Sequence, residues 1–168
     1  MDFEKVIKER TSIRKFKIDK ISNEIIEKIL IAGNLAPTAR NIQPQIIFIV
    51  QSHEGLEKID KASPCRFNAP LVMLVCSDKN IAFEKNGHST YEMDACIVAT
   101  HMMLCATNLG IGSIWIEQFN REIIKNEFEL GDNVEPICLI PMGYKADDHI
   151  ISPSHFIRKP LYKNVKFV

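Results

Sequence analysis

The sequence predicts an α/β or α+β domain in which helices cover a sheet. The prediction depends on two kinds of segment that occur in one chain. Short runs of apolar and β-branched residues, bounded by prolines and polar residues, are typical of buried strands. Longer segments repeat apolar residues every three or four positions, which is typical of helices that pack on one side.

The N-terminal part of the chain is expected to hold two helices. Residues 2–10 gather their apolar side chains on one helical face. The second helix starts at Ser22, since serine is favoured at helix N-caps, and it ends near Gly33 and Asn34. The Ala36-Pro37 pair that follows forces a turn.

The same two patterns predict the remaining elements. Strands are expected at 45–51, 71–76, 113–116 and 137–142. Further helices are expected at 54–61, 91–108 and 121–129. The helix over 91–108 is apolar on so much of its surface that we expect it to be buried on several sides. Residues 79–90 are polar and are expected to form a surface loop.

Residues 145–168 form a tail without a clear period, yet seven large apolar side chains lie within 156–168. Such residues need a surface to cover, and a partner subunit is one candidate.

Length and composition exclude several classes of protein. A chain of 168 residues fits one domain, 1–168. Lysines plus arginines equal aspartates plus glutamates at 21 each, so no global field holds nucleic acid or an anionic membrane. The longest apolar runs are far too short to span a bilayer, and the acidic, amphipathic start does not resemble a signal peptide. The five cysteines form no C-x-x-C pair, and we expect reduced, mostly buried thiols in the cytoplasm.

Arg10, Ser12 and Arg14 are the first candidates for binding. In an extended segment alternate side chains share a side, so two guanidinium groups and a hydroxyl would face one phosphate. The alternative is a pair of surface arginines near a helix C-terminus, and the spacing alone favours that alternative.

Three further sites along the chain each allow two interpretations. Residues 36–45 carry Thr38, Asn41 and Gln43, which suit a flat heterocycle with donors and acceptors, but the segment taken alone favours a polar helix-to-strand connection. Asp94 fits the role of an acid at a helix start better than a catalytic role. Arg158-Lys159 is a cationic pair that can also be simply solvated.

Other common sites are absent from the sequence. Gly110-Ile111-Gly112 follows a helix and precedes a strand, the reverse of the dinucleotide fingerprint. No phosphate-binding loop for a nucleoside triphosphate, no metal-ligand spacing among the histidines and no G-x-S-x-G motif is present.

Taken together, the motifs resemble the nitroreductase family of FMN-dependent oxidoreductases. They are R-T-S-I-R-K-F at 10–16, A-P-T-A-R-N-I-Q-P at 36–44, A-P-L-V-M-L-V at 69–75, D-A-C-I-V-A-T-H-M-M-L-C-A-T-N-L-G-I-G-S-I-W at 94–115, P-M-G-Y at 141–144 and R-K at 158–159. Their order covers essentially the whole chain, which is similar to the compact members of the family.

The resemblance implies an α+β sandwich around a mixed, mostly antiparallel sheet, in an intertwined homodimer with FMN at the interface. It also implies that the tail 145–168 wraps the partner subunit. Residues that match the family's phosphate and ribityl contacts are Arg10, Thr11, Ser12, Arg14, Arg158 and Lys159. Pro37, Thr38 and Asn41 match residues that reach the flavin of the other subunit, and Ile116 and Glu117 match the strand at its reactive edge. Gln118 departs from the pattern, because a glycine is usual there.

The implied activity passes hydride from NADH or NADPH through bound FMN to a small organic oxidant such as a nitroaromatic or a quinone. The flavin carries the redox chemistry, so no catalytic side chain and no metal is assigned. Alternatives are a low-turnover FMN-binding protein that stores flavin or senses redox state, a reductase for enones, free flavin or halogenated aromatics, and a cofactor-free structural domain. Neither nucleic acid nor membrane is expected as a partner.

Overall fold

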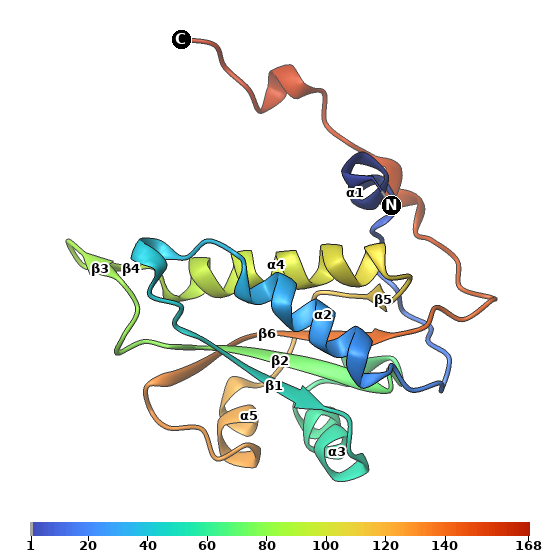
Figure 1. Ribbon diagram of the computed structural model, residues 1–168, viewed down its shortest axis with the longest axis horizontal. Helices are drawn as coiled ribbons and strands as arrows, with labels where there is room; N and C mark the ends of the chain where they lie inside the picture. Colours follow the sequence, from blue (N-terminus) through green and yellow to red (C-terminus); the bar gives the residue numbers. More distant parts are fainter. Residues whose placement is uncertain (1) are drawn as a thin grey trace.

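The chain, whose computed structural model describes residues 2–168, is built around a four-stranded antiparallel sheet (Figure 1). Its strands, in spatial order, are β1 (Gln45–Val50), β2 (Leu71–Asp78), β6 (Val134–Gly143) and β5 (Gly112–Ser113). The only parallel pairing among residues 2–168 is an isolated bridge between Ser12 and Ser113. All four strands therefore run antiparallel to their neighbours, and this bridge is the only parallel component that residues 2–168 add to the mostly antiparallel sheet.

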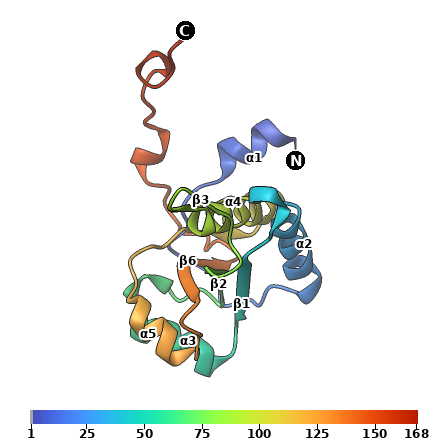
Figure 2. The same ribbon diagram turned by 90° about the vertical axis from the view of Figure 1, so that its left-hand side faces the viewer.

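Helices cover both faces of the sheet (Figures 1 and 2). On one face lie α2 (Asn23–Asn34) and α4 (Tyr91–Asn108), and on the other lie α3 (His53–Ala62) and α5 (Arg121–Glu127). Alternation along β2 divides the core, because Met73 packs with the α2–α4 layer whereas Leu74 packs with the α3–α5 layer. The fold is thus the α+β sandwich that the resemblance implies.

Local signals explain where the helices begin. The side chains of Ser22, Ser52 and Asn120 each accept a backbone N–H at the start of their helix. The predicted helix over 91–108 is confirmed without change. Because its apolar residues lie on several sides, it contacts α2, β2 and β6 at once. Gly33 permits close packing of α2 on α4, since an added Cβ would lie 2.7 Å from Cγ of Met102.

Three predicted elements differ from the structure. The surface loop over 79–90 contains a short hairpin of β3 (Glu84–Lys85) and β4 (His88–Ser89), which turns at Asn86-Gly87, where both φ angles are positive. The strand expected at 113–116 narrows to β5 plus an isolated bridge between Ile116 and Leu139. β6 starts at Val134, earlier than predicted, because β2 continues to Asp78 and pairs with it across a bulge.

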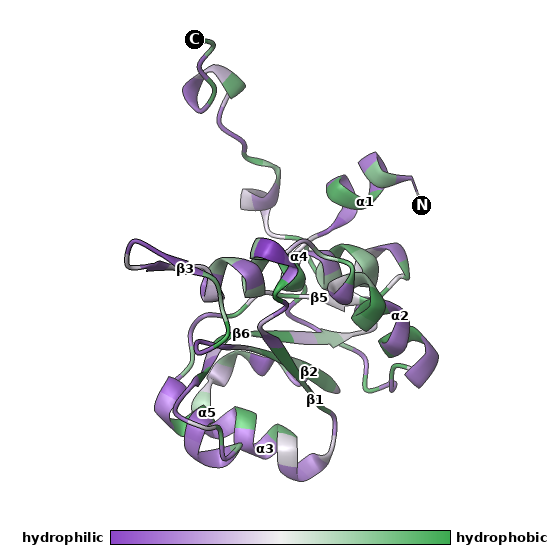
Figure 3. Cartoon of the chain, turned by 60° about the vertical axis from the view of Figure 1, so that its left-hand side comes forward, coloured by the Kyte–Doolittle hydropathy of each residue, from purple (hydrophilic) through white to green (hydrophobic). Residues whose placement is uncertain are grey.

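Both ends of the chain stand away from this sandwich (Figures 1 and 2). Helix α1 (Phe3–Glu9) buries Val6 but leaves Phe3 and Ile7 exposed. In the tail, the exposed large apolar side chains are Phe156, Ile157, Leu161, Tyr162, Val165, Phe167 and Val168. Figure 3 shows this apolar character in patches on α1 and along the tail, outside the apolar strands at the centre. No helix in the described part of the chain is both long enough and apolar enough to cross a membrane.

All five cysteines are free thiols. Cys76 and Cys138 are buried in the sheet, whereas Cys65, Cys96 and Cys105 are only half-buried, so the expectation of mostly buried thiols is wrong. Burial raises the pKa of the Cys76 thiol to about 12 and raises that of Cys138 further. These two thiols therefore stay protonated at neutral pH.

Candidate functional site

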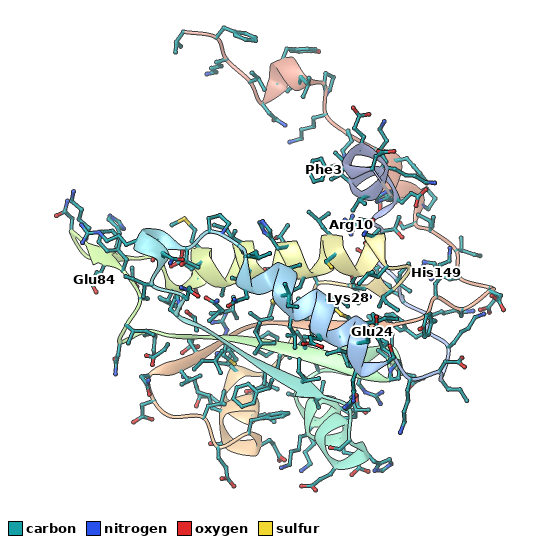
Figure 4. The ribbon with its side chains drawn as sticks, in the orientation of Figure 1. Phe3, Arg10, Glu24, Lys28, Glu84 and His149 are labelled. Atoms are coloured by element: carbon teal, nitrogen blue, oxygen red, sulfur yellow. The ribbon has the colours of Figure 1, made fainter. Side chains whose placement is uncertain are left out.

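A small cationic cavity lies at the C-terminal end of α4. It has a volume of about 240 Å³, and Arg10, Ser12, Arg14 and Arg158 line it together with Ile151, Ser152, Ser154 and His155. The extended segment after α1 places Arg10, Ser12 and Arg14 on one side, as alternation predicts. The two arginines thus line one cavity together. Figure 4 shows Arg10 between α1 and the end of α4, with His149 on the segment that leads to the tail.

The cavity is electrostatically unbalanced. Within residues 2–168, no ion pair includes Arg10, Arg14 or Arg158. The guanidinium of Arg158 donates to the backbone carbonyls of His155 and Ile157, which carry no charge. Burial and the positive charge of Arg158 lower the pKa of Arg10. Like charges held together without a carboxylate form a site that an anion such as a phosphate would stabilise.

The cation cluster also affects a neighbouring histidine. Burial, followed by the charges of Lys145 and Arg14, lowers the pKa of His149, so its imidazole is neutral at pH 7. Within the described chain the buried Nε2 atom of His149 has no hydrogen-bond partner. The site therefore gains no positive charge from His149.

A larger cavity of about 500 Å³ adjoins the first and shares Ile151 and His155 with it. Thr11 lines this second cavity, because alternation turns it away from Arg10 and Ser12. Ser113 also lines it, and the buried hydroxyl of Ser113 lacks a hydrogen-bond partner in the part of the chain that the structure describes. Such a hydroxyl is available to a ligand that carries polar groups.

The segment after β5 leads away from the cations. Ile116 is buried, and its backbone N–H and carbonyl are both paired with Leu139 at 2.9 and 3.0 Å. The next residue, Glu117, is exposed, and its Oε1 accepts the Trp115 Nε1–H at 2.9 Å. The carbonyl of Gln118 accepts a 2.6 Å hydrogen bond from the Ser63 hydroxyl, which holds the end of this segment on the 62–66 turn.

Pro37, Thr38 and Asn41 lie at the opposite end of α4. Their loop is fixed to Asp94 in the first turns of that helix, whereas Thr107 near its other end lines the larger cavity. The helical rise puts about 20 Å between Asp94 and Thr107. In Figure 4, Glu84 marks the loop end of α4 and Arg10 marks the cavity end. One chain therefore does not bring this loop together with its own arginines.

Several cavity residues were not predicted. Ser152, Ser154 and His155 line the cationic cavity beside the arginines. Sequence periodicity cannot predict these residues. They reach the cavity only because the folded tail lies beside residues 10–14, which are far away in the sequence. Arg158 lines the cavity, whereas Lys159 does not.

Comparison with known proteins accounts for this architecture. The model of the nitroreductase family matches residues 7–68 and 63–144. A crystal structure of a nitroreductase family protein from Clostridium difficile 630 is 38% identical, with a TM-score of 0.93 over 99% of this chain and 98% of that one. A Methanothermobacter thermautotrophicus relative, provisionally named NADH dehydrogenase/NAD(P)H nitroreductase, is 31% identical over 88% of this chain and 80% of its own length.

A more distant structure carries a ligand. It comes from Exiguobacterium sibiricum 255-15, was solved in complex with FMN, and shares the fold at 20% identity with a TM-score of 0.87 over 100% of this chain and 98% of that one. The match of the family model over most of the chain, together with relatives above 30% identity across most of their length, leads to one conclusion. The chain belongs to the nitroreductase family, whose named relatives are NAD(P)H oxidoreductases.

Proposed function

We propose that this protein is an FMN-dependent oxidoreductase that passes hydride from NADH or NADPH to a small organic oxidant such as a nitroaromatic or a quinone. The observation that carries the proposal is the cavity in which Arg10, Arg14 and Arg158 meet without a carboxylate. A terminal phosphate supplies the charge that these residues lack. The FMN bound to the Exiguobacterium structure and the NAD(P)H-linked names of relatives support the choice of ligand and electron donor.

The residues present fit a phosphate ester that extends toward Glu117. Arg10, Arg14 and Ser12 hold the phosphate, and Arg158 approaches from the tail. Ser12 bridges to Ser113, and the chain from Ser113 to Glu117 is at most ~13 Å long when extended. The ribityl chain of FMN covers one part of this span and its ring covers the rest, and Ser113 and Thr11 line the cavity along the way.

The protein's own contribution is binding and orientation. When bound, the flavin supplies the hydride-accepting and hydride-donating centre. Glu117 is oriented by the Trp115 indole, and the backbone of Ile116 is fixed on Leu139, so this edge of the site is rigid. Rigid placement of the reacting groups is what accelerates a transfer between two bound partners.

A homodimer completes the site in this proposal. Pro37, Thr38 and Asn41 lie about 20 Å along α4 from the arginines of their own chain, so they serve the flavin of the partner subunit. The exposed apolar residues of α1 and of the tail 145–168 then cover the partner. Residues 1–168 act as one FMN-binding domain, and its location in the cytoplasm stays a prediction.

Two measurements test the proposal. Purified protein is expected to show the visible absorption of a flavin, and denaturation is expected to release FMN. Recovery of FAD alone, or a protein that stays colourless after incubation with FMN, would overturn it. Steady-state oxidation of NADH and NADPH is then measured with an added nitroaromatic and an added quinone. A yellow protein with neither activity would instead be a flavin store or sensor.

A further inference from the structure

A buried carboxylate that the proposed chemistry does not use lies at the loop end of α4. The side chain of Asp94 is 3% exposed, and both of its oxygens are partnered. Oδ1 accepts the backbone N–H of Ala39 at 2.9 Å, and Oδ2 accepts the hydroxyl hydrogen of Thr90 at 2.8 Å. Asp94 lies inside the helix, and its carboxylate bonds to a segment 55 residues away instead of capping α4.

The segment that Asp94 holds is the short 3-10 turn over Ala39–Asn41. The residue at the cap position of this turn, Thr38, makes no capping hydrogen bond with its side chain. The hydroxyl of Thr38 instead accepts the Gln43 N–H at 3.0 Å. Asp94 therefore supplies, from another element, an acceptor for the first N–H of the turn, which the turn itself leaves without a partner.

The same loop is strained. Arg40, Asn41 and Gln43 have φ angles of 53°, 57° and 57°, a left-handed conformation that residues other than glycine rarely adopt. Such conformations persist only where the surroundings enforce them, and they cluster at functional sites. Here the Arg40 guanidinium lies 4.5 Å from the ring centroid of Phe83, whose carbonyl accepts a 2.9 Å hydrogen bond from the backbone N–H of Thr90. Thr90 thus links Asp94 to Phe83, the residue whose ring contacts Arg40 of the loop.

We propose that Asp94 is a positioning residue that holds residues 38–43 in the conformation needed at the flavin of the partner subunit. The inference rests on the proposed function, because that function assigns Thr38 and Asn41 to the flavin. Without the Asp94 acceptor, the Ala39 N–H loses its partner, and the left-handed residues relax toward ordinary backbone angles. The phosphate site lies at the other end of α4, so FMN still binds but its ring meets a displaced loop.

The test compares three variants of the full-length FMN-bound protein. Asp94→Leu removes both acceptors at similar size. Asp94→Asn keeps an acceptor for Ala39 and can donate to the Thr90 oxygen, so it is the rescue variant. Glu92→Gln removes an exposed acid from the same turn and is the matched control. Each variant is examined by hydrogen exchange over 38–43, by the shape of the flavin absorption band and by kcat with a quinone.

Asp94→Leu is expected to speed exchange over 38–43, to alter the flavin band and to lower kcat about 10- to 100-fold, with FMN still bound. Asp94→Asn is expected to restore all three, and Glu92→Gln to change none. Unchanged exchange in Asp94→Leu, or fast exchange with an unchanged band and kcat, would overturn the inference while leaving the proposed function intact. If Asp94→Leu does not fold, Thr90→Val replaces it. In Thr90→Val, faster hydrogen exchange over 38–43 together with a partly lowered kcat then supports the proposal. Exchange and kcat equal to those of the wild type overturn it.

Discussion

Ser12 and Ser113 form a parallel β-bridge, in which the backbone N–H of Ile13 donates a 3.0 Å hydrogen bond to the Ser113 carbonyl. This single pairing joins the cationic segment after α1 to the strand that follows α4. It fixes Arg10 and Arg14 relative to the segment that continues to Glu117, so the charged end of the cavity and the proposed flavin edge form one rigid unit.

Loss of Arg14 is expected to weaken FMN binding. A charge-assisted hydrogen bond contributes about 1.5–3 kcal/mol, so Arg14→Ala is expected to raise the Kd for FMN roughly 10- to 150-fold. Arg10→Ala is expected to act similarly, because both side chains line the same cavity. Fluorescence titration of apoprotein with FMN measures the effect. His53→Ala and His88→Ala change exposed residues and serve as controls; equal affinity in all four variants would mean that the phosphate lies elsewhere.

Removal of the tail is expected to separate the subunits and release the flavin. Truncation after Ser154 deletes Arg158 and all seven exposed apolar side chains of the tail. Phe156→Ala with Leu161→Ala keeps the cation and removes only packing, where each large side chain buried on a partner contributes about 1.5–3 kcal/mol. Sedimentation of the double variant is expected to show a weakened dimer with partial loss of FMN.

The matched control for the tail is Lys163→Ala with Lys166→Ala, which changes two exposed polar residues of the same segment. It is expected to sediment as the wild type. A full-length protein that sediments as a yellow monomer at micromolar concentration would refute the link between dimer and cofactor.

Glu135 is expected to make stability depend on pH. Its carboxylate, 13% exposed, accepts hydrogen bonds from Lys125, Lys79 and Arg121 at 2.9–3.3 Å. Burial acts to raise the pKa of Glu135, but the hydrogen bonds from Lys125 and Lys79 outweigh it and hold the pKa below its ordinary value. A lowered folded-state pKa stabilises the protein above the unfolded pKa, and this stabilisation is lost as the pH falls through the folded one.

Glu135→Gln is therefore expected to lower the free energy of unfolding by about 1–3 kcal/mol at pH 7. The difference from the wild type is expected to shrink as the medium is acidified below the ordinary range of a carboxyl group. Urea unfolding at several pH values measures it, and Glu84→Gln on the exposed hairpin is the control. A difference that stays constant down to low pH would show that the ion cluster is not its source.

The thiols are expected to differ strongly in reactivity. The pKa of Cys76, raised by burial to about 12 from 9.0, lowers its thiolate fraction about a thousandfold at neutral pH, and Cys138 is affected in the same way. Cys65, half-buried on the 64–66 turn, is expected to be alkylated first. Mass spectrometry after brief alkylation of native and denatured protein tests the order. Early labelling of Cys76 or Cys138 in native protein would mean that the sheet opens locally.

Much of the fold follows from local sequence signals. Ser22 caps the helix that it was expected to cap, and the run from Leu71 forms the central strand, because burial on both faces requires continuous apolar residues. The Asn86-Gly87 pair was the available signal for the missed hairpin, since both residues favour the positive φ of a tight turn. Its strands are too short and polar to show an alternation.

The candidate site was predictable only in part. Alternation places Arg10, Ser12 and Arg14 together, because the spacing that matters lies within five residues. The bond from Asp94 to Ala39 spans 55 residues, so nothing near Asp94 in the sequence distinguishes it from an ordinary helix-start acid. Ser152 and His155 reach the cavity only because the tail folds back to residues 10–14. The tail sequence has no helical or strand periodicity from which this could be predicted.

The placement of Arg14 and Asp94 toward opposite ends of α4 has a genetic consequence. In the proposed dimer each site takes its arginines from one chain and its 38–43 loop from the other. A mixed dimer of an Arg14→Ala chain and an Asp94→Leu chain collects both defects in one site and leaves the other site wholly wild type. Two alleles that are each defective are therefore expected to complement one another when they are co-expressed, whereas two different substitutions within the arginine cluster are not.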